Sequence, residues 1–294
     1  MSDIVDAFDD YDDPTFKLTG IPGFPYETFQ SQLAKYQEAE RWFTGAVLED
    51  EGWVDDQTDL YPLKINPLIG LCMKHAQTLF GVAEDDARPL VRPKLVPKKS
   101  DDEAEKQSIA DCEESLFQIW HDNHGRGIMM ENALLSQIYG GCVFKVIYTP
   151  ENEARPIKIE RINPKSFIGI PKNGDHYRLS EAWVVKRISL REAGKLGYRG
   201  TDDAPWYIEH WTETSRDIWI NDEVARQTYD DGTINEYAGD NDWGFVPFVY
   251  IPHIRIGSFI GINTFDHVKG LIKELNLRFG DYGDAVNTDS HTTV

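Results

Sequence analysis

Hydrophobic residues recur every three or four positions in the first half of the chain, a spacing that predicts helices. Between residues 26 and 48 six large apolar residues fall on one stripe: Tyr26, Phe29, Leu33, Tyr36, Phe43 and Val47. Asn66 followed by Pro67 predicts the start of a second helix, because asparagine caps a helix and proline suits its first turn. Gly81 is expected to end it.

Two more helices are predicted before residue 141. Residues 100–103 (SDDE) form a capping box that starts a helix reaching Trp120, and a fourth helix is expected from about Gly127 to Tyr139. Three prolines punctuate the stretch 88–99, which is therefore predicted to be an extended linker.

After residue 141 the period changes to two, which predicts strands. The runs are short and rich in β-branched and aromatic residues: CVFKVIYT, PIKIERI, EAWVVKRI, WYIEHWTE, RDIWI and FVPFVYI. Asp231-Gly232 predicts a hairpin turn. Ser189, with Glu192 three residues later, predicts one short helix among the strands. These strands are expected to form an antiparallel meander.

The last stretch of the chain carries a heptad pattern of apolar residues. The positions are spaced alternately three and four apart: Phe265, Val268, Ile272, Leu275, Phe279, Tyr282 and Val286. This spacing predicts a long helix that begins near Asn263 or Thr264. Such a stripe is expected to be buried against other polypeptide.

Helices followed by strands and then a helix predict the α+β class. Four parts are expected along the chain. Residues 1–25 form an acidic, disordered tail, residues 26–141 a helical part, residues 142–260 a β-rich part, and residues 261–294 the long C-terminal helix.

Charge and composition narrow the functions that the chain can have. The formal net charge is −20, and the strongest run of Lys and Arg lies within residues 94–99. Tight, static binding of nucleic acid is therefore not expected. Solubility or adaptation to high salt would explain the acidity, and the alternative is that the protein handles a polyanion that it must not hold tightly. No long apolar segment or signal peptide is apparent, so we expect no membrane partner. Three scattered cysteines, Cys72, Cys112 and Cys142, are predicted to be buried thiols.

A search for catalytic motifs gives little. The phosphate-binding loop, the nucleophile elbow, the HExxH zinc motif and the EF-hand loop do not occur in the sequence. His121 and His124 have a spacing that could hold a metal, but a polar helix end explains them better, so neither a metal nor a cofactor is predicted.

A pair of carboxylates provides the one enzymatic alternative. Glu209 and Glu213 are predicted on one face of a strand, near Trp206, Trp211 and Trp219, as in a glycosidase-like cleft. A carboxylate-dependent hydrolase is thus one alternative function. An acidic, monomeric interaction module is another.

Three segments together resemble the portal proteins of tailed bacteriophages. The helix NPLIGLCMKHAQTLFG (residues 66–81) resembles one near the start of many portal chains. The stretch LLSQIYGGCVFKVIYTPENEARPIKIERINPKSFIGI resembles the family's helix, glycine turn and strand pair. Residues 241–286 resemble the junction between the wing and the stem. The likeness extends over residues 63–291 as many weak matches.

The resemblance implies a non-enzymatic structural subunit of a ring, typically a dodecamer, at one capsid vertex. It also implies that the ring is assembled in the host cytoplasm and ends in the virion, where double-stranded DNA passes transiently through it. The implied partners are other copies of the chain, a terminase motor, capsid and scaffold proteins, and a tail adaptor. The likeness covers only the N-terminal wing and the first stem helix and stops before the clip, so we expect residues 1–294 alone to form a monomer or a loose oligomer.

The resemblance also assigns roles on the C-terminal helix. The seven heptad residues would form the seam between subunits and with a second stem helix, whereas packing on the chain's own sheet is the alternative. Lys269, Lys273 and Arg278 are candidate DNA-facing residues, and ion pairs with Asp266, Glu274 or Asp281 are the alternative for them.

Overall fold

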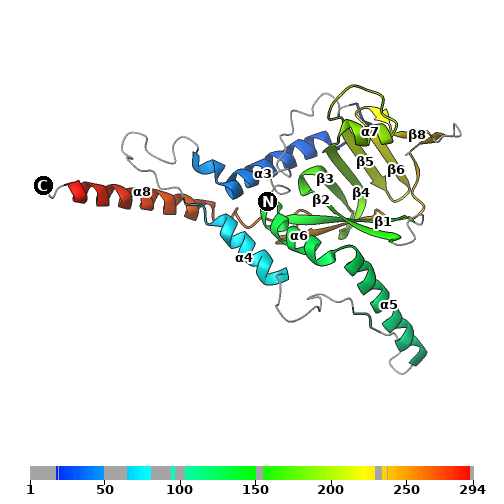
Figure 1. Cartoon of the computed structure of the whole chain (residues 1–294), viewed down its shortest axis with the longest axis horizontal. Helices are drawn as coiled ribbons and strands as arrows, with labels where there is room; N and C mark the ends of the chain where they lie inside the picture. Colours follow the sequence, from blue (N-terminus) through cyan, green and yellow to red (C-terminus); the bar gives the residue numbers. More distant parts are fainter. Residues whose placement is uncertain are drawn as a thin grey trace. The chain divides into compact units, whose positions relative to one another are not determined.

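A computed structural model of the chain describes residues 18, 20–49, 65–80, 94–96, 103–149, 155–228, 234–236 and 238–291. These residues confirm the α+β class, with helices and antiparallel sheets (Figure 1). The chain divides into two compact units. Unit 1 comprises Met1–Lys74, Leu135–Gly141 and Pro252–Val294, and unit 2 comprises His75–Leu134 and Cys142–Ile251.

Unit 1 is largely helical. Helix α3 spans Tyr26–Thr44 and ends at Gly45, whose left-handed backbone (φ 85°) forms the C-cap. The 3-10 helix η2 (Ala46–Glu49) follows. The unit also contains the first turns of α4 (Leu68–Phe80), the last turn of α6 (Gly125–Tyr139) and helix α8 (Lys269–His291).

The apolar stripe of the first helix forms the core of unit 1. Phe29, Leu33, Tyr36 and Phe43 are buried along α3, as the sequence pattern predicts. The Tyr36 ring packs edge-on against Tyr139, with centroids 5.0 Å apart. Leu18 and Ile21 are also buried, so the prediction of a disordered tail reaching residue 25 extends too far. Residues 1–17, which hold most of that tail, lie outside the described residues.

Unit 2 contains the strands, and they form two main sheets where the sequence predicted one meander. The first has three strands in the order β11 (Phe248–Pro252), β1 (Gly141–Tyr148) and β2 (Ile157–Ile162). The second has the order β10 (Gly239–Asp240), β6 (Ser215–Ile220), β5 (Trp206–Thr212), β4 (Asp175–Arg187) and β3 (Phe167–Lys172), with β7 (Glu223–Val224) paired to β6. The 3-10 helix η3 (Pro164–Ser166) leads into β3, a strand that the sequence analysis missed.

The shorter predicted elements of unit 2 are present. Helix α7 (Leu190–Lys195) starts with the expected capping box of Ser189 and Glu192. It places Ala193 on the six-stranded sheet, beside Ile218 and Ile220. Strands β8 (Arg226–Thr228) and β9 (Ile234–Glu236) form the predicted hairpin, although its turn lies outside the described residues. Helix α5 spans Glu103–Asp122, and its predicted cap at Ser100 is likewise outside.

One edge of the three-stranded sheet is closed by a side chain. Asn123, just after α5, donates from Nδ2 to the carbonyl of Ile157 at 2.9 Å and accepts from the N–H of Ile159 at 2.9 Å. Its amide thus pairs with β2 as a neighbouring strand would. These bonds fix the C-terminal end of α5 on unit 2.

Candidate functional site

The C-terminal helix begins later than the heptad pattern predicts. Phe265 and Val268 precede α8, which starts at Lys269. The side chain of Asn263 accepts hydrogen bonds from the N–H groups of Phe265 (2.9 Å) and Asp266 (2.8 Å), and this closes a turn before the helix. The predicted capping residue therefore caps a turn, and the regular helix follows it.

The first half of α8 is anchored on unit 1. Phe265 is fully buried and stacks on Phe43 of α3, with ring centroids 6.3 Å apart, and Ile272 is buried as well. Asn276 is buried, and its amide accepts from the N–H of Ile65 at 2.8 Å and donates to the carbonyl of Ile65 at 3.1 Å. This part of the heptad stripe is therefore covered by the chain's own helices.

The second half of the heptad stripe is exposed. Leu275 is 36% exposed, Phe279 37%, Tyr282 69% and Val286 50%. Together with Leu271, which is 69% exposed, they lie within roughly 80° of one another around the helix axis. The heptad spacing places Leu275 in one seam with Ile272, but the structure buries Asn276 and leaves Leu275 exposed. Helix α8 therefore has one face packed on the rest of unit 1 and, beside it, an exposed apolar face. We call this exposed face the α8 stripe; it consists of Leu271, Leu275, Phe279, Tyr282 and Val286.

The three candidate DNA-facing cations differ in their surroundings. Lys269 pairs with Glu38 at 2.7 Å and Asp266 at 3.0 Å, and its ammonium lies 5.7 Å from the centre of the Trp42 ring. Burial by itself lowers the pKa of Lys269, but the hydrogen bonds to these carboxylates outweigh it and raise the pKa. Lys269 therefore helps to hold the start of α8 on α3, another helix of unit 1.

The other two cations lie further along the helix and are exposed. Arg278 pairs with Glu274 at 2.8 Å and approaches Asp281 at 3.9 Å, whereas Lys273 is exposed on another side of the helix. Neutralising all three cations, as the portal resemblance would suggest, would therefore mix an effect on stability with any effect on DNA.

Lys269→Ala is expected to lower the free energy of unfolding by about 1 kcal/mol, because it leaves Glu38 without its cation. Arg278→Ala is expected to stay within about 0.5 kcal/mol, since its ion pairs are solvent-exposed. Urea titration of both variants measures the difference. Equal losses would mean that Lys269 has no special role in fixing α8.

The predicted catalytic carboxylate Glu209 is buried in a polar network of unit 2. Its two oxygens receive hydrogen bonds from Lys145 Nζ at 2.6 and 2.7 Å. Trp211 Nε1 donates at 2.6 Å and the Tyr207 hydroxyl at 3.1 Å. Burial raises the pKa of Glu209, but Lys145, Trp211 and Arg216 outweigh it and lower the pKa. The carboxylate is therefore ionised, and it links β5 to β1 of the other sheet.

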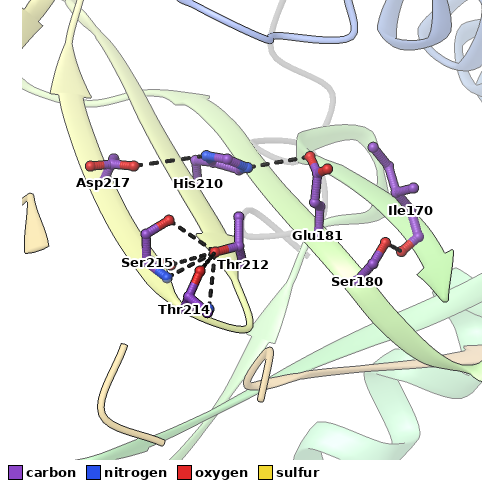
Figure 2. Close-up of polar contacts among 8 residues, drawn as sticks. All are labelled: Ile170, Ser180, Glu181, His210, Thr212, Thr214, Ser215 and Asp217. Carbon is purple, nitrogen blue, oxygen red and sulfur yellow. Dashed lines mark hydrogen bonds and ion pairs between the residues drawn. The ribbon is translucent and has the colours of Figure 1, made fainter. Parts of the chain in front are cut away.

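Glu213 does not share this environment. Strand β5 ends at Thr212, and the Thr212 hydroxyl accepts from the N–H groups of Thr214 (3.1 Å) and Ser215 (2.8 Å), which closes a turn (Figure 2). Glu213 lies in this turn and pairs with Lys172 at 2.7 Å. The strand alternation used to place Glu213 beside Glu209 therefore does not reach it.

A second polar cluster, which the sequence analysis missed, surrounds His210 on the opposite face of β5. Its Nε2 lies 3.4 Å from Glu181 on β4 and its Nδ1 3.9 Å from Asp217 on β6 (Figure 2). The ring stacks on Trp183 with centroids 3.7 Å apart. Only the pairing register of the strands could have revealed this cluster, because His210 on β5 is paired with Trp183 on β4 and with Asp217 on β6.

Unfolding measurements at different pH values test the protonation of His210. Burial lowers its pKa below the usual 6.5, and the opposing carboxylates do not cancel this. The unfolded state then binds more protons than the folded state just below pH 6.5, so stability falls as the pH drops through this window. We expect the urea midpoint of the wild type to fall more between pH 7 and pH 5 than that of His210→Gln. Parallel curves would contradict the prediction.

The other candidate sites of the sequence analysis do not assemble. Among the described residues no group of three or more His, Cys, Asp or Glu side chains could hold a metal ion. His124 lies beyond the end of α5 with a positive φ of 54°. Cys72 and Cys142 are buried, as predicted, but Cys112 is exposed on α5. Burial raises the pKa of Cys72 to about 11 and that of Cys142 to about 12.

Comparison with known proteins adds no relative. No protein-family model matches the sequence, and a search of curated proteins finds no match. In the part of the chain that the structure describes, every helix is too short or too polar to cross a membrane.

Proposed function

We propose that the protein is a structural, non-catalytic subunit of a viral portal ring through which double-stranded DNA passes. The observation that supports this most is the α8 stripe. One face of α8 is fastened to unit 1 through Phe265, Ile272 and Asn276, while an adjacent apolar face remains exposed. A helix held in place with a second apolar face is suited to a heterologous contact with another copy, and such contacts close rings.

The surroundings of the two carboxylates favour this proposal over a hydrolase. A glycosidase-type acid must hold a proton and reach the substrate. Glu209 is buried, ionised and bonded through both oxygens, and Glu213 is engaged by Lys172. Neither arrangement suits general acid catalysis. The other alternative, an acidic monomeric module, does not explain why the first half of α8 is packed on the rest of unit 1 while an apolar stripe beside it is exposed.

The charge of the chain agrees with a conduit for DNA. With a net charge of −20, the subunit repels phosphates on average, so DNA would slide past it without being held. Within this proposal the partners are further copies, a terminase motor, capsid and scaffold proteins and a tail adaptor, and the protein is located in the virion after assembly in the host cytoplasm.

Native mass spectrometry and negative-stain microscopy test the proposal on the product of the complete reading frame that contains this chain. We expect closed rings for the wild type. Leu275→Asp and Tyr282→Asp should each give folded monomers, because they place a charge on the α8 stripe. Thr288→Asp is the matched control, since this exposed residue lies on another side of α8. A folded wild-type monomer, or rings that survive both substitutions, would overturn the proposal.

A further inference from the structure

A group of basic side chains surrounds the short helix α7, which lies on the six-stranded sheet of unit 2 (Figure 1). Arg191 and Lys195 are four positions apart on this helix, so they share one side of it. Each is two positions from Ala193, which packs on the sheet, so both cations lie on the side of α7 that faces away from the sheet.

A third cation extends this group at the end of β4. Lys186 is paired with Tyr207, and its Nζ lies 5.3 Å from the centre of the Tyr207 ring, which packs on the core beneath α7. Hydrogen bonds with Ser189 lower the pKa of Glu192, and Lys186 and Lys195 lower it further, which places both ammonium groups near this carboxylate. We call the three cations the α7 patch; they are Lys186, Arg191 and Lys195.

The charges of the α7 patch are available to another molecule. All three side chains are exposed, and none forms an ion pair with a carboxylate in the part of the chain that the structure describes. Glu192 lies beside them, but it accepts from the N–H of Ser189 at 3.1 Å and from its hydroxyl at 2.9 Å. Three cations and one carboxylate leave a net charge of +2 here, on a chain whose total is −20.

The sequence contains an acidic segment that suits this patch. Residues 3–13 (DIVDAFDDYDD) carry six aspartates and no lysine or arginine, and they lie outside the described residues. A free polyanion such as DNA is repelled by the chain as a whole. A segment of a neighbouring copy in an assembly is instead held near the patch, which raises its effective concentration to about the millimolar range. Charge therefore favours this segment of another copy over a free polyanion.

We propose that the α7 patch binds residues 3–13 of a second copy of the chain. Aspartates of that segment face the guanidinium of Arg191 and the ammonium groups of Lys186 and Lys195. The contact offsets part of the repulsion between copies of net charge −20. It deepens the ring proposal and rests on it for the arrangement of the copies, but it does not use the α8 stripe.

A fluorescein-labelled peptide of residues 1–17 is the probe, and fluorescence anisotropy at about 0.05 M salt measures its affinity for the chain of residues 1–294. Arg191→Gln/Lys195→Gln should weaken binding roughly tenfold. Lys172→Gln/Arg178→Gln removes the same two charges at the other end of β4, where it pairs with β3, and should leave the affinity within about twofold. A peptide with asparagine in place of all six aspartates should not bind. Circular dichroism checks that each variant is folded.

Equal effects of the two double variants, or binding of the asparagine peptide, would overturn the proposal. So would a DNA duplex of about 17 base pairs that displaces the probe at a lower concentration than the unlabelled peptide does, since the patch would then be a nucleic-acid site.

Replacing the same six aspartates by asparagine within the full chain tests whether the segment occupies the patch of its own chain. The proposal expects the same affinity for the probe as the wild type has, and tighter binding would overturn the contact between copies. These measurements need no ring. Failure of the peptide to bind would therefore count against this contact alone, whereas a folded wild-type monomer from the complete reading frame would count against the ring.

Discussion

Lys145→Met is expected to lower the free energy of unfolding by about 3–5 kcal/mol. Lys145 and Glu209 are both buried, and the ammonium donates to both carboxylate oxygens at 2.6 and 2.7 Å. Removing the cation leaves the carboxylate inside unit 2 with the hydrogen bonds from Trp211 and Tyr207 and with Arg216 as a more distant cation, its Nε 3.9 Å away. An uncompensated buried charge is far more costly than a lost surface ion pair.

Urea titration with a double-mutant cycle measures this effect. Lys145→Met/Glu209→Gln should recover most of the loss, because no buried charge is then left unpaired and the glutamine oxygen still accepts from Trp211. Lys172→Met is the control, since it breaks an ion pair of similar length with the half-exposed Glu213, and should cost less than about 1 kcal/mol. If Lys145→Met were as mild as the control, Glu209 would have to be accessible to water, and its exclusion as a general acid would fail.

Local signals in the sequence are sufficient for most elements of the fold. The capping box of α7 is present, and Asn66 caps the start of α4 by accepting from the N–H of Leu68 at 3.1 Å, whereas α3 ends at Gly45, before the predicted stripe ends at Val47. These features depend on hydrogen bonds between residues a few positions apart, so the sequence contains the information directly. The same holds for the antiparallel strands, whose alternation is visible within each run.

Features that depend on distant contacts were not predicted. The division of the strands into two sheets depends on which strands pair, and β11 joins β1 across about a hundred residues. The environment of Glu209 depends on Lys145, which lies 64 positions earlier, and the position of Glu213 depends on a turn that ends β5. His210 has no distinctive neighbours in the sequence, and its carboxylates come from adjacent strands.

The C-terminal helix shows both kinds of outcome. A helix was correctly predicted, and two residues of its apolar spacing, Phe265 and Ile272, are buried on the chain itself. The spacing did not show which of them pack on the chain itself, because Asn276, a polar residue, takes a buried place through its bonds to Ile65. A hydrophobic pattern cannot reveal such a position.

Gly140→Ala is expected to cost more than about 3 kcal/mol, from two separate causes. Gly140 has a φ of +79°, which disfavours any residue with a Cβ by about 1–2 kcal/mol. An added Cβ would also lie 2.3 Å from the carbonyl oxygen of Gly261, in the segment that leads into α8. That segment is held by hydrogen bonds from His253 N–H to the Gly140 carbonyl and from Thr264 N–H to the Gln137 carbonyl, so the backbone has little room to move.

Gly174→Ala separates the two causes, because Gly174 has the same φ of +79° but no atom within 4 Å of an added Cβ. It should lose only the conformational part, about 1–2 kcal/mol, and Gly140→Ala should exceed it by the cost of the clash. Hydrogen exchange then locates the damage: amides of residues 262–272 should lose protection in Gly140→Ala and keep it in Gly174→Ala. Equal losses of stability would mean that the approach of Gly140 to Gly261 is not needed to hold α8 in place. The anchored first half of α8, on which the ring proposal depends, would then lose its support.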